Sequence, residues 1–497
     1  MKSVFLFTAL LTACGATPVA SSGPPRVTIP VAPSASVADP GPPPSLASKE
    51  ALFPKVARRV LPNGLEVAVV EAHALPIVQV RLFVRAGMGY GGPALASLTA
   101  QLLKDGGTRS MKNTELVERI ERLGATLSVQ TGLDSTVLGL GITKEHLSEA
   151  IAILAEMVRS PRFEETELDK LKARATDEAE DSARSDGSWT ATRVLFHELY
   201  QSTSPYAVYD ASPADIRKVT GKTVRTFHRR FYVPKNTTLV VAGDTTLDLA
   251  ADVAVHSFGT WAGGNAPVRE AVPLVASKGR RVVIAHRPQS AQSDVFAVGT
   301  VPQRDTPDWP AIRVATQVLG GGPASRLFMD VREKRSLAYQ TRASLIELAQ
   351  GPQPVVAYAG TRTAKTAEAL DGLLENLERM VTAAPSEDEL ATARRYLVDV
   401  FAIRMETVGA IADMVVTEST LGLGDGYWDR YRAKLRTVDA KAVGEVSRAM
   451  FRPTLIVVAG DADVIGTSLT RFGVVTVVDP EHEFRLVRTL PAAAAAR

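Results

Sequence analysis

The sequence TLVVAGD at residues 238–244 recurs as TLIVVAGD at residues 454–461, which places the shared VVAGD strings 217 residues apart (460 − 243). Two strand-like apolar runs, residues 66–70 and 282–285, lie at a similar separation. Self-similarity of this length indicates a repeated structural unit. The chain is therefore predicted to contain one unit twice.

Each copy alternates strand-like and helix-like patterns. Residues 78–84 alternate apolar and polar side chains before running apolar, as a strand with one covered face does. Thr114 is predicted to cap a helix with an apolar stripe at Leu116, Ile120 and Leu123, closed by Gly124. Because most links are short, the pattern favours an α+β class over a doubly wound parallel sheet. We expect two homologous domains, each a mainly antiparallel sheet packed against helices.

Turn residues and changes in composition set the expected boundaries. The first domain is predicted at residues 52–263 and the second at residues 279–478, with a linker at 264–278 that begins beside the GGNAP sequence. Residues 479–497 are predicted to form a tail.

The N-terminus resembles a bacterial lipoprotein signal. Lys2 precedes an apolar run at residues 4–13, and LTAC at residues 11–14 resembles a lipobox, so residues 1–13 are predicted to be removed and Cys14 to carry lipid. A plain secretory signal with an incidental thiol remains the alternative. Residues 14–51 are rich in proline and predict an extended tether. Gly15 rather than aspartate after the cysteine resembles lipoproteins sent to the outer membrane. The resemblance implies a lipid-anchored, periplasm-facing protein of the bacterial envelope.

Composition excludes several kinds of site and partner. Lysine and arginine number 57 against 54 acidic residues, for a formal charge of +3, and without a long basic run this balance argues against nucleic acid as the partner. A single cysteine excludes an internal disulfide and a cysteine-based zinc site. None of the seven histidines lies three or four residues from another, so no helix is predicted to present a histidine pair to a metal.

Three further patterns are interpreted as structural. The acidic run at residues 177–181 is typical of a solvated helix face, and His197-Glu198 of a helix surface. The glycines at positions 422, 424 and 426 have the wrong spacing for a dinucleotide fingerprint and indicate a loop between helices.

Several ordered motifs resemble one peptidase family. ALASLTAQLL at residues 94–103 leads into Gly-Gly-Thr at 106–108, and a Phe-Tyr-x-Pro-x-Asn motif follows at 231–236. The second half contains LGGGPASRLF at 319–328 and REKRSLAY at 332–339. Together these resemble the insulinase-like (pitrilysin) metallopeptidases, in their short two-domain, processing-peptidase branch, over roughly residues 55–475. The resemblance implies that this chain forms half of a clamshell around a peptide.

The sequence departs from that family at the zinc motif. Active members carry His-x-x-Glu-His, in which two histidines one turn apart bind zinc and the glutamate acts as the base. The aligned positions hold Ser97, Ala100 and Gln101 instead. The resemblance places the third ligand of the family near Asp177 or Glu178, and a single carboxylate does not hold zinc. No metal is therefore expected in this chain.

The second-half motif is intact. Arg332 and Tyr339 have the spacing of the arginine/tyrosine pair of the family, which implies that the Tyr339 hydroxyl donates to an oxyanion and that Arg332 orients the substrate. The glycines at positions 320, 321 and 322 are expected to form a helix-end turn that permits positive φ, with a secondary role in binding substrate. The alternatives are a surface ion pair of Arg332 with Glu333 or Asp330, and a Tyr339 that merely opens a strand.

In two-subunit relatives, one chain holds the zinc and the other the arginine/tyrosine pair. The resemblance therefore implies a zinc-free subunit that acts on peptides with a zinc-bearing partner and is inactive alone. The alternative is a catalytically dead protein that binds peptide or acts as a scaffold in the cell envelope.

Overall fold

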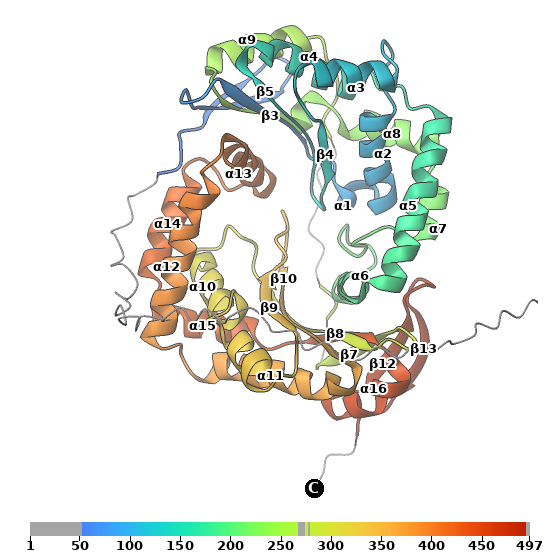
Figure 1. Ribbon diagram of the computed structural model, residues 1–497, viewed down its shortest axis with the longest axis vertical. Helices are drawn as coiled ribbons and strands as arrows, with labels where there is room; N and C mark the ends of the chain where they lie inside the picture. Colours follow the sequence, from blue (N-terminus) through green and yellow to red (C-terminus); the bar gives the residue numbers. More distant parts are fainter. Residues whose placement is uncertain (1–51, 267–273, 277–278, 494–497) are drawn as a thin grey trace, which may run out of the picture. The chain divides into compact units, whose positions relative to one another are not determined.

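The computed structural model describes residues 52–266, 274–276 and 279–493 (Figure 1). The predicted signal sequence, Cys14 and the predicted tether at residues 14–51 lie outside the described residues, and so does part of the predicted linker. No helix in the described part of the chain is both long enough and apolar enough to cross a membrane.

The first TLVVAGD segment forms the central strand of a six-stranded sheet. The strands lie in the order β1-β2-β6-β3-β5-β4, in which β2 and β6 run parallel and all other neighbours antiparallel. All seven residues of β6 are buried, which agrees with the apolar run that follows its two threonines. The bounds are β1 (Ala57–Val60), β2 (Glu66–Glu71), β3 (Ile77–Val84), β4 (Ser128–Thr131), β5 (Thr136–Thr143) and β6 (Thr237–Gly243).

The second copy forms a seven-stranded sheet with the same internal order. Its order β13-β12-β7-β11-β8-β10-β9 contains the series β7-β11-β8-β10-β9, which matches β2-β6-β3-β5-β4 of the first sheet strand for strand. The bounds are β7 (Arg281–His286), β8 (Gln292–Val301), β9 (Gln340–Leu345), β10 (Gln353–Arg362), β11 (Leu455–Gly460), β12 (Val475–Asp479) and β13 (Arg485–Leu490). The predicted α+β class with two homologous sheet-and-helix halves is confirmed. β13 lies within the residues assigned to a tail, yet it pairs along β12.

Helices from each half bury one face of its own sheet. In the first half these are α2 (Pro93–Asp105), α3 (Asn113–Arg122), α4 (Leu147–Arg159), α5 (Glu165–Ser185), α8 (Gly221–Phe231) and α9 (Leu247–Phe258). In the second half they are α10 (Trp309–Gly320), α11 (Thr366–Thr382), α12 (Glu387–Arg404), α14 (Tyr427–Thr437), α15 (Ala440–Met450) and α16 (Ala462–Leu469). The short helices α1 (Met88–Gly91) and α7 (Pro213–Lys218) complete the first half.

The opposite faces of the two sheets are covered by helices exchanged between the halves. α6 (Gly187–Leu199) belongs to the first half, but its Val194 and Phe196 pack with Val283 and Phe296 of the second sheet. α13 (Val408–Leu421) belongs to the second half, and its Val415 packs among buried residues of the first sheet. Each sheet therefore depends on the other half for the burial of its second face.

Close packing explains one of the predicted glycines. The glycines at positions 320 to 322 lie at the C-terminal end of α10, where the helix-end turn was predicted, and none of them has a positive φ. Instead, a Cβ built on Gly320 would lie 2.1 Å from the backbone nitrogen of Ala343. Glycine is needed there because α10 ends directly against β9.

Other local predictions have mixed outcomes. Gly124 adopts φ 66° and ends the predicted helix, but the helix begins at Asn113, so the predicted cap at Thr114 is wrong. The backbone N–H of Lys112 donates instead to Glu115 Oε2 at 2.9 Å. As predicted, the glycines at 422, 424 and 426 lie in a loop between two helices, α13 and α14, and all three have positive φ. The acidic side chains at residues 177–181 lie on the exposed face of α5.

One histidine in the first core makes stability depend on pH. His228 is 9% exposed and its Nε2 lies 2.7 Å from the carbonyl oxygen of Val158. Burial lowers the pKa of His228 from 6.5 to about 4, so the native protein keeps the ring neutral where an unfolded chain would protonate it.

We expect this difference to cost stability as the pH falls below 6.5. Between pH 7 and pH 5 the contribution of His228 to the free energy of unfolding should fall by about 2 kcal/mol, because only the unfolded state gains the proton. Urea denaturation at both pH values measures it. His228→Gln retains an N–H donor without a titrating ring and should remove that part of the pH dependence, and an unchanged pH dependence in this variant would contradict the assignment.

Candidate functional site

The degenerate zinc motif lies on α2. Ser97 and Gln101 lie one turn apart and line a cavity of about 350 Å³, whereas Ala100 is fully buried and is not among the lining residues. Pro93 occupies the first turn of α2, where its missing N–H costs nothing, and Gly92 before it adopts φ 85°.

The opposite wall of this cavity comes from α5. Glu178 and Arg174 line it together with Ser182, while Asp177 does not. Of the two carboxylates considered as the third ligand, the structure therefore brings only Glu178 to the cavity of Ser97 and Gln101. α2 and α5 stand beside each other in Figure 1.

The donors in this cavity do not fit zinc. A zinc site in proteins takes thiolate, imidazole or carboxylate ligands. Two carboxylates line the cavity, Glu178 and Asp210. Ser97 and Gln101 offer only a neutral hydroxyl and amide in place of the two histidines, and Arg174 brings a positive charge.

Sequence reasoning missed two further residues of this cavity. The indole Nε1 of Trp189, in the first turn of α6, donates to Asp210 Oδ2 at 2.7 Å, and both side chains line the cavity. Nothing in the sequence separates Trp189 from an ordinary core aromatic, because its position depends on how α6 packs.

Arg332 makes local contacts. It lies in a π-helical segment, Phe328–Lys334, with its guanidinium 4.6 Å from the centre of the Phe328 ring and its Nε 3.6 Å from Glu333 Oε1. The ion pair with Glu333 is the one named as the structural alternative. About half of the side chain is exposed, so the guanidinium keeps open donors.

Tyr339 is half exposed, at 50%, and directly precedes the edge strand β9. Its backbone N–H donates to the Gly360 carbonyl at 3.0 Å, and its phenol donates to Gln292 Oε1 at 3.0 Å. Burial and the nearby Asp294 carboxyl raise the pKa of Tyr339 above its usual value. The phenol therefore carries a proton at neutral pH and can donate it in a hydrogen bond.

The polar residues behind Tyr339 form a hydrogen-bonded layer. The Tyr358 phenol donates to Asp294 Oδ1 at 2.7 Å, and the Arg342 guanidinium lies 3.8 Å from the centre of the Tyr358 ring. Burial raises the pKa of Asp294.

The structure does not bring all the predicted site residues together. Neither Arg332 nor Tyr339 is among the residues that line the cavity of Ser97 and Gln101. Gly321 and Gly322 line a separate cavity of about 360 Å³ beside α12, with Pro323 and Tyr396.

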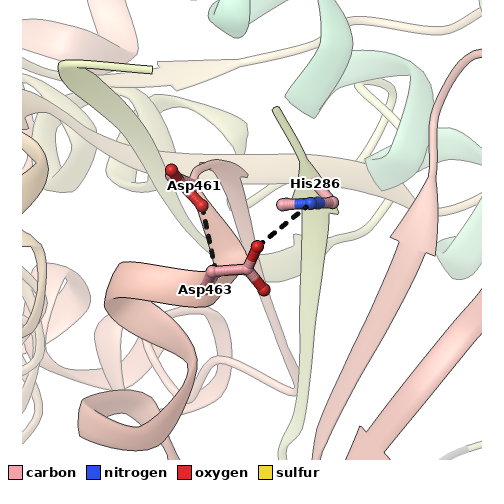
Figure 2. Close-up of side chains that lie close together, drawn as sticks. All are labelled: His286, Asp461 and Asp463. Atoms are coloured by element: carbon pink, nitrogen blue, oxygen red, sulfur yellow. Dashed lines mark hydrogen bonds and ion pairs between the residues drawn. The ribbon is translucent and has the colours of Figure 1, made fainter. Parts of the chain in front are cut away.

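Figure 2 shows a second cluster that the sequence did not predict. His286, at the end of β7, meets Asp461 and Asp463 at the start of α16, with one ligand atom of each within 4.8 Å of the others. The Ala462 N–H donates to His286 Nδ1, and the backbone N–H groups of Gln289 and Asp463 donate to Asp461.

These contacts indicate a helix cap. Arg488 donates to Asp463 Oδ1 at 2.5 Å and lowers the pKa of that carboxyl. The N-terminal end of a helix favours anions and disfavours a cation. In the first half, Asp244 ends the same VVAGD string and contacts a histidine directly, His73 at 2.7 Å, whereas Asp461 accepts from backbone N–H groups.

The sequence matches two descriptions of one peptidase family. Residues 66–205 match Insulinase (Peptidase family M16), and residues 218–397 match Peptidase M16 inactive domain.

Several known proteins are similar over most of the chain. An uncharacterised zinc protease of Streptomyces coelicolor is 24% identical over 417 residues, 81% of this chain and 89% of that protein. The non-peptidase homologue YmxG of Helicobacter pylori is 22% identical over 385 residues, and the zinc protease PqqE of the same bacterium is 24% identical over 397, each covering 76% of this chain and 87% of the relative.

The fold is also found in solved structures. The crystal structure of a peptidase M16 inactive domain from Pseudomonas fluorescens aligns with a TM-score of 0.76 at 24% identity, covering 82% of this chain and 98% of that one. The repeated sheets, the motifs and these matches agree, and the chain belongs to the insulinase-like peptidase family M16 as a member whose zinc motif is degenerate.

Proposed function

We propose that this chain is the zinc-free subunit of a heteromeric insulinase-like peptidase. In this role it supplies Arg332 and Tyr339 to a peptide that is held jointly with a zinc-bearing partner subunit. The observation that carries the proposal is the contrast between the two halves of the chain: α2 presents Ser97 and Gln101 where ligands are needed, while the Tyr339 phenol is protonated and half exposed.

The similarity to two proteins of one bacterium supports a paired arrangement. Helicobacter pylori has both a non-peptidase homologue and a zinc protease that are similar to this chain over three quarters of its length. One organism therefore contains a zinc-type and a non-peptidase-type relative. The proposal extends this pairing to the present chain, which would be anchored through Cys14 at the periplasmic side of the outer membrane.

The chemistry assigned to this chain is the stabilisation of negative charge. A phenol hydroxyl aimed at the peptide carbonyl donates more strongly as the oxygen gains charge in the transition state. Tyr339 would exchange its bond to Gln292 for one to the substrate. Arg332 would orient the peptide backbone through its exposed N–H groups, at the expense of its contact with Glu333.

The first prediction concerns Tyr339 in the assembled enzyme. Tyr339→Phe should lower the kcat of the complex by about 100-fold with little change in KM, since the lost hydrogen bond strengthens only in the transition state. Steady-state cleavage of a peptide library by the complex with the zinc-bearing relative measures this. Lys334→Met changes an exposed side chain near Arg332 and serves as the control with unchanged rates.

Two outcomes would contradict the proposal. If the zinc-bearing relative cleaves at its full rate alone, this chain is not needed for catalysis. If Tyr339→Phe and Arg332→Met both leave the complex unchanged, the chain acts as the catalytically dead peptide-binding or scaffold protein, and the local contacts of Arg332 are its whole role.

A second prediction tests the zinc position. Because Ser97, Gln101 and Glu178 line one cavity, Ser97→His with Gln101→His should create a site for about one zinc ion per chain, with two histidines and a carboxylate. The number of zinc ions bound per chain is measured by mass spectrometry after dialysis. Adding Glu178→Ala should weaken zinc binding at least tenfold, whereas Asp177→Ala, the neighbour outside the cavity, should not. Equal effects of the two alanine substitutions on zinc binding would show that Glu178 does not face Ser97 and Gln101 as the structure has it.

A further inference from the structure

Arg193 on α6 is a buried cation of unusual surroundings. Its side chain is 7% exposed, and its guanidinium contacts two aromatic rings, at 4.7 Å from the centre of the Trp189 ring and 5.0 Å from that of Phe484. Trp189 belongs to the first half of the chain and Phe484 to the turn between β12 and β13 in the second.

No ion pair or hydrogen bond accounts for this charge among residues 52–266, 274–276 and 279–493. The acids that act on it from a distance are Asp210 and Asp215. Asp210 accepts from the Trp189 indole and the Ala211 N–H, and Asp215 accepts from Ser212 and Lys218. Burial lowers the pKa of Arg193, because the charged form has lost water without a direct partner in return.

Arg304 is a second buried arginine of this fold, and it has direct partners. It is also 7% exposed and lies against aromatic rings, 5.0 Å from that of Trp428. Unlike Arg193, it forms an ion pair with Glu347 and donates to the Tyr427 hydroxyl. Buried charges in proteins are normally paired in this way, since an unpaired one is costly.

Arg193 lines a cavity. A space of about 400 Å³ is lined by Arg193 together with Arg184, Arg217 and His482, which come from both halves of the chain. Glu180 and Glu481 also line it and are exposed, as are the other two arginines. Arg193 is therefore the buried charge at the inner end of a cavity whose outer residues carry mixed charges.

Phe484 lies against Arg193 in a turn whose backbone conformation is unfavourable for residues other than glycine. Glu483 and Phe484 both have positive φ, at 51° and 56°, in a turn closed by the Arg485 N–H donating to the His482 carbonyl at 3.0 Å. Side chains other than glycine rarely adopt this conformation, and it persists only where the surroundings enforce it. Here it places the phenyl ring against the guanidinium.

We propose that this cavity binds an oxyanion, a phosphate or carboxylate group carried on a small molecule, with Arg193 as its principal ligand. Aromatic rings contact the planar guanidinium but accept no conventional hydrogen bond from it, so its N–H groups can bind two oxygens of one anion. The volume is within the range of small-molecule sites and exceeds what one inorganic ion fills. Arg217 and Arg184 add charge at the rim.

The test uses the purified full chain in low-salt buffer. Inorganic phosphate, glycerol phosphate and citrate are titrated separately, with heat of binding and tryptophan fluorescence as readouts, because Trp189 stacks on Arg193. We expect saturable binding of one molecule per chain for at least one of the three. Tighter binding of glycerol phosphate or citrate than of inorganic phosphate identifies an organic anion and its group.

Arg193→Met keeps an apolar stem between the rings and should weaken that binding at least tenfold. Arg122→Met removes an exposed charge on α3, away from the cavity, and should leave it unchanged. If Arg193→Met does not fold, Arg217→Gln and Arg184→Gln at the rim should each weaken binding several-fold. Absence of saturable binding for all three anions at 50 mM, or equal affinity of the Arg193 variant, would overturn the proposal.

Discussion

The burial of both faces of each sheet is the constraint on which this structure depends. The VVAGD strands β6 and β11 are apolar on both faces, so each sheet needs a cover on either side. Helices of the same half supply one cover, and α6 and α13 are exchanged to supply the other. An ion pair of Arg58 with Glu418, whose side chain is 1% exposed, lies between β1 and α13. Neither half buries its sheet alone.

The exchanged helix α6 also positions two cavities, that of Ser97 and Gln101 and that of Arg193. α5 ends and α6 begins at Asp186, which accepts a hydrogen bond from the Trp189 N–H. Gly187 follows at a close approach, since an added Cβ would lie 2.1 Å from Asp294 Oδ2. From this junction Trp189 reaches the cavity of the degenerate motif, and Arg193, one turn on, reaches the second cavity. The docking of α6 on the second sheet therefore determines the geometry of each.

Much of the fold could be predicted from the sequence because it depends on local and periodic signals. The repeated VVAGD string predicted the matching strands, and Gly124 and the glycines of the 422–426 loop marked chain reversals that occur where expected. The exchange of α6 and α13 could not be predicted, since an apolar helix face does not specify which sheet it covers. Likewise the close approach of Gly320 to Ala343 could not be predicted, because it joins residues distant along the chain.

Some features of the candidate sites could be predicted from the sequence, and others could not. The absence of zinc ligands at Ser97 and Gln101 is visible in the sequence, and so is the Arg332–Tyr339 spacing. That Arg193 has no ion-pair partner within the described part of the chain is not visible in the sequence, because it depends on which acids lie close in three dimensions and which of them already accept hydrogen bonds. Trp189 and Phe484 gave no signal for the same reason, since their rings meet Arg193 only after the two halves pack.

The most direct test of the account is native mass spectrometry of this chain mixed with a zinc-bearing relative from the same organism. The account predicts a complex of one copy of each chain that carries a single zinc ion, with no zinc on this chain when it is measured alone. A complex with two zinc ions, or zinc retained by the isolated chain, would contradict it, and so would the absence of any complex.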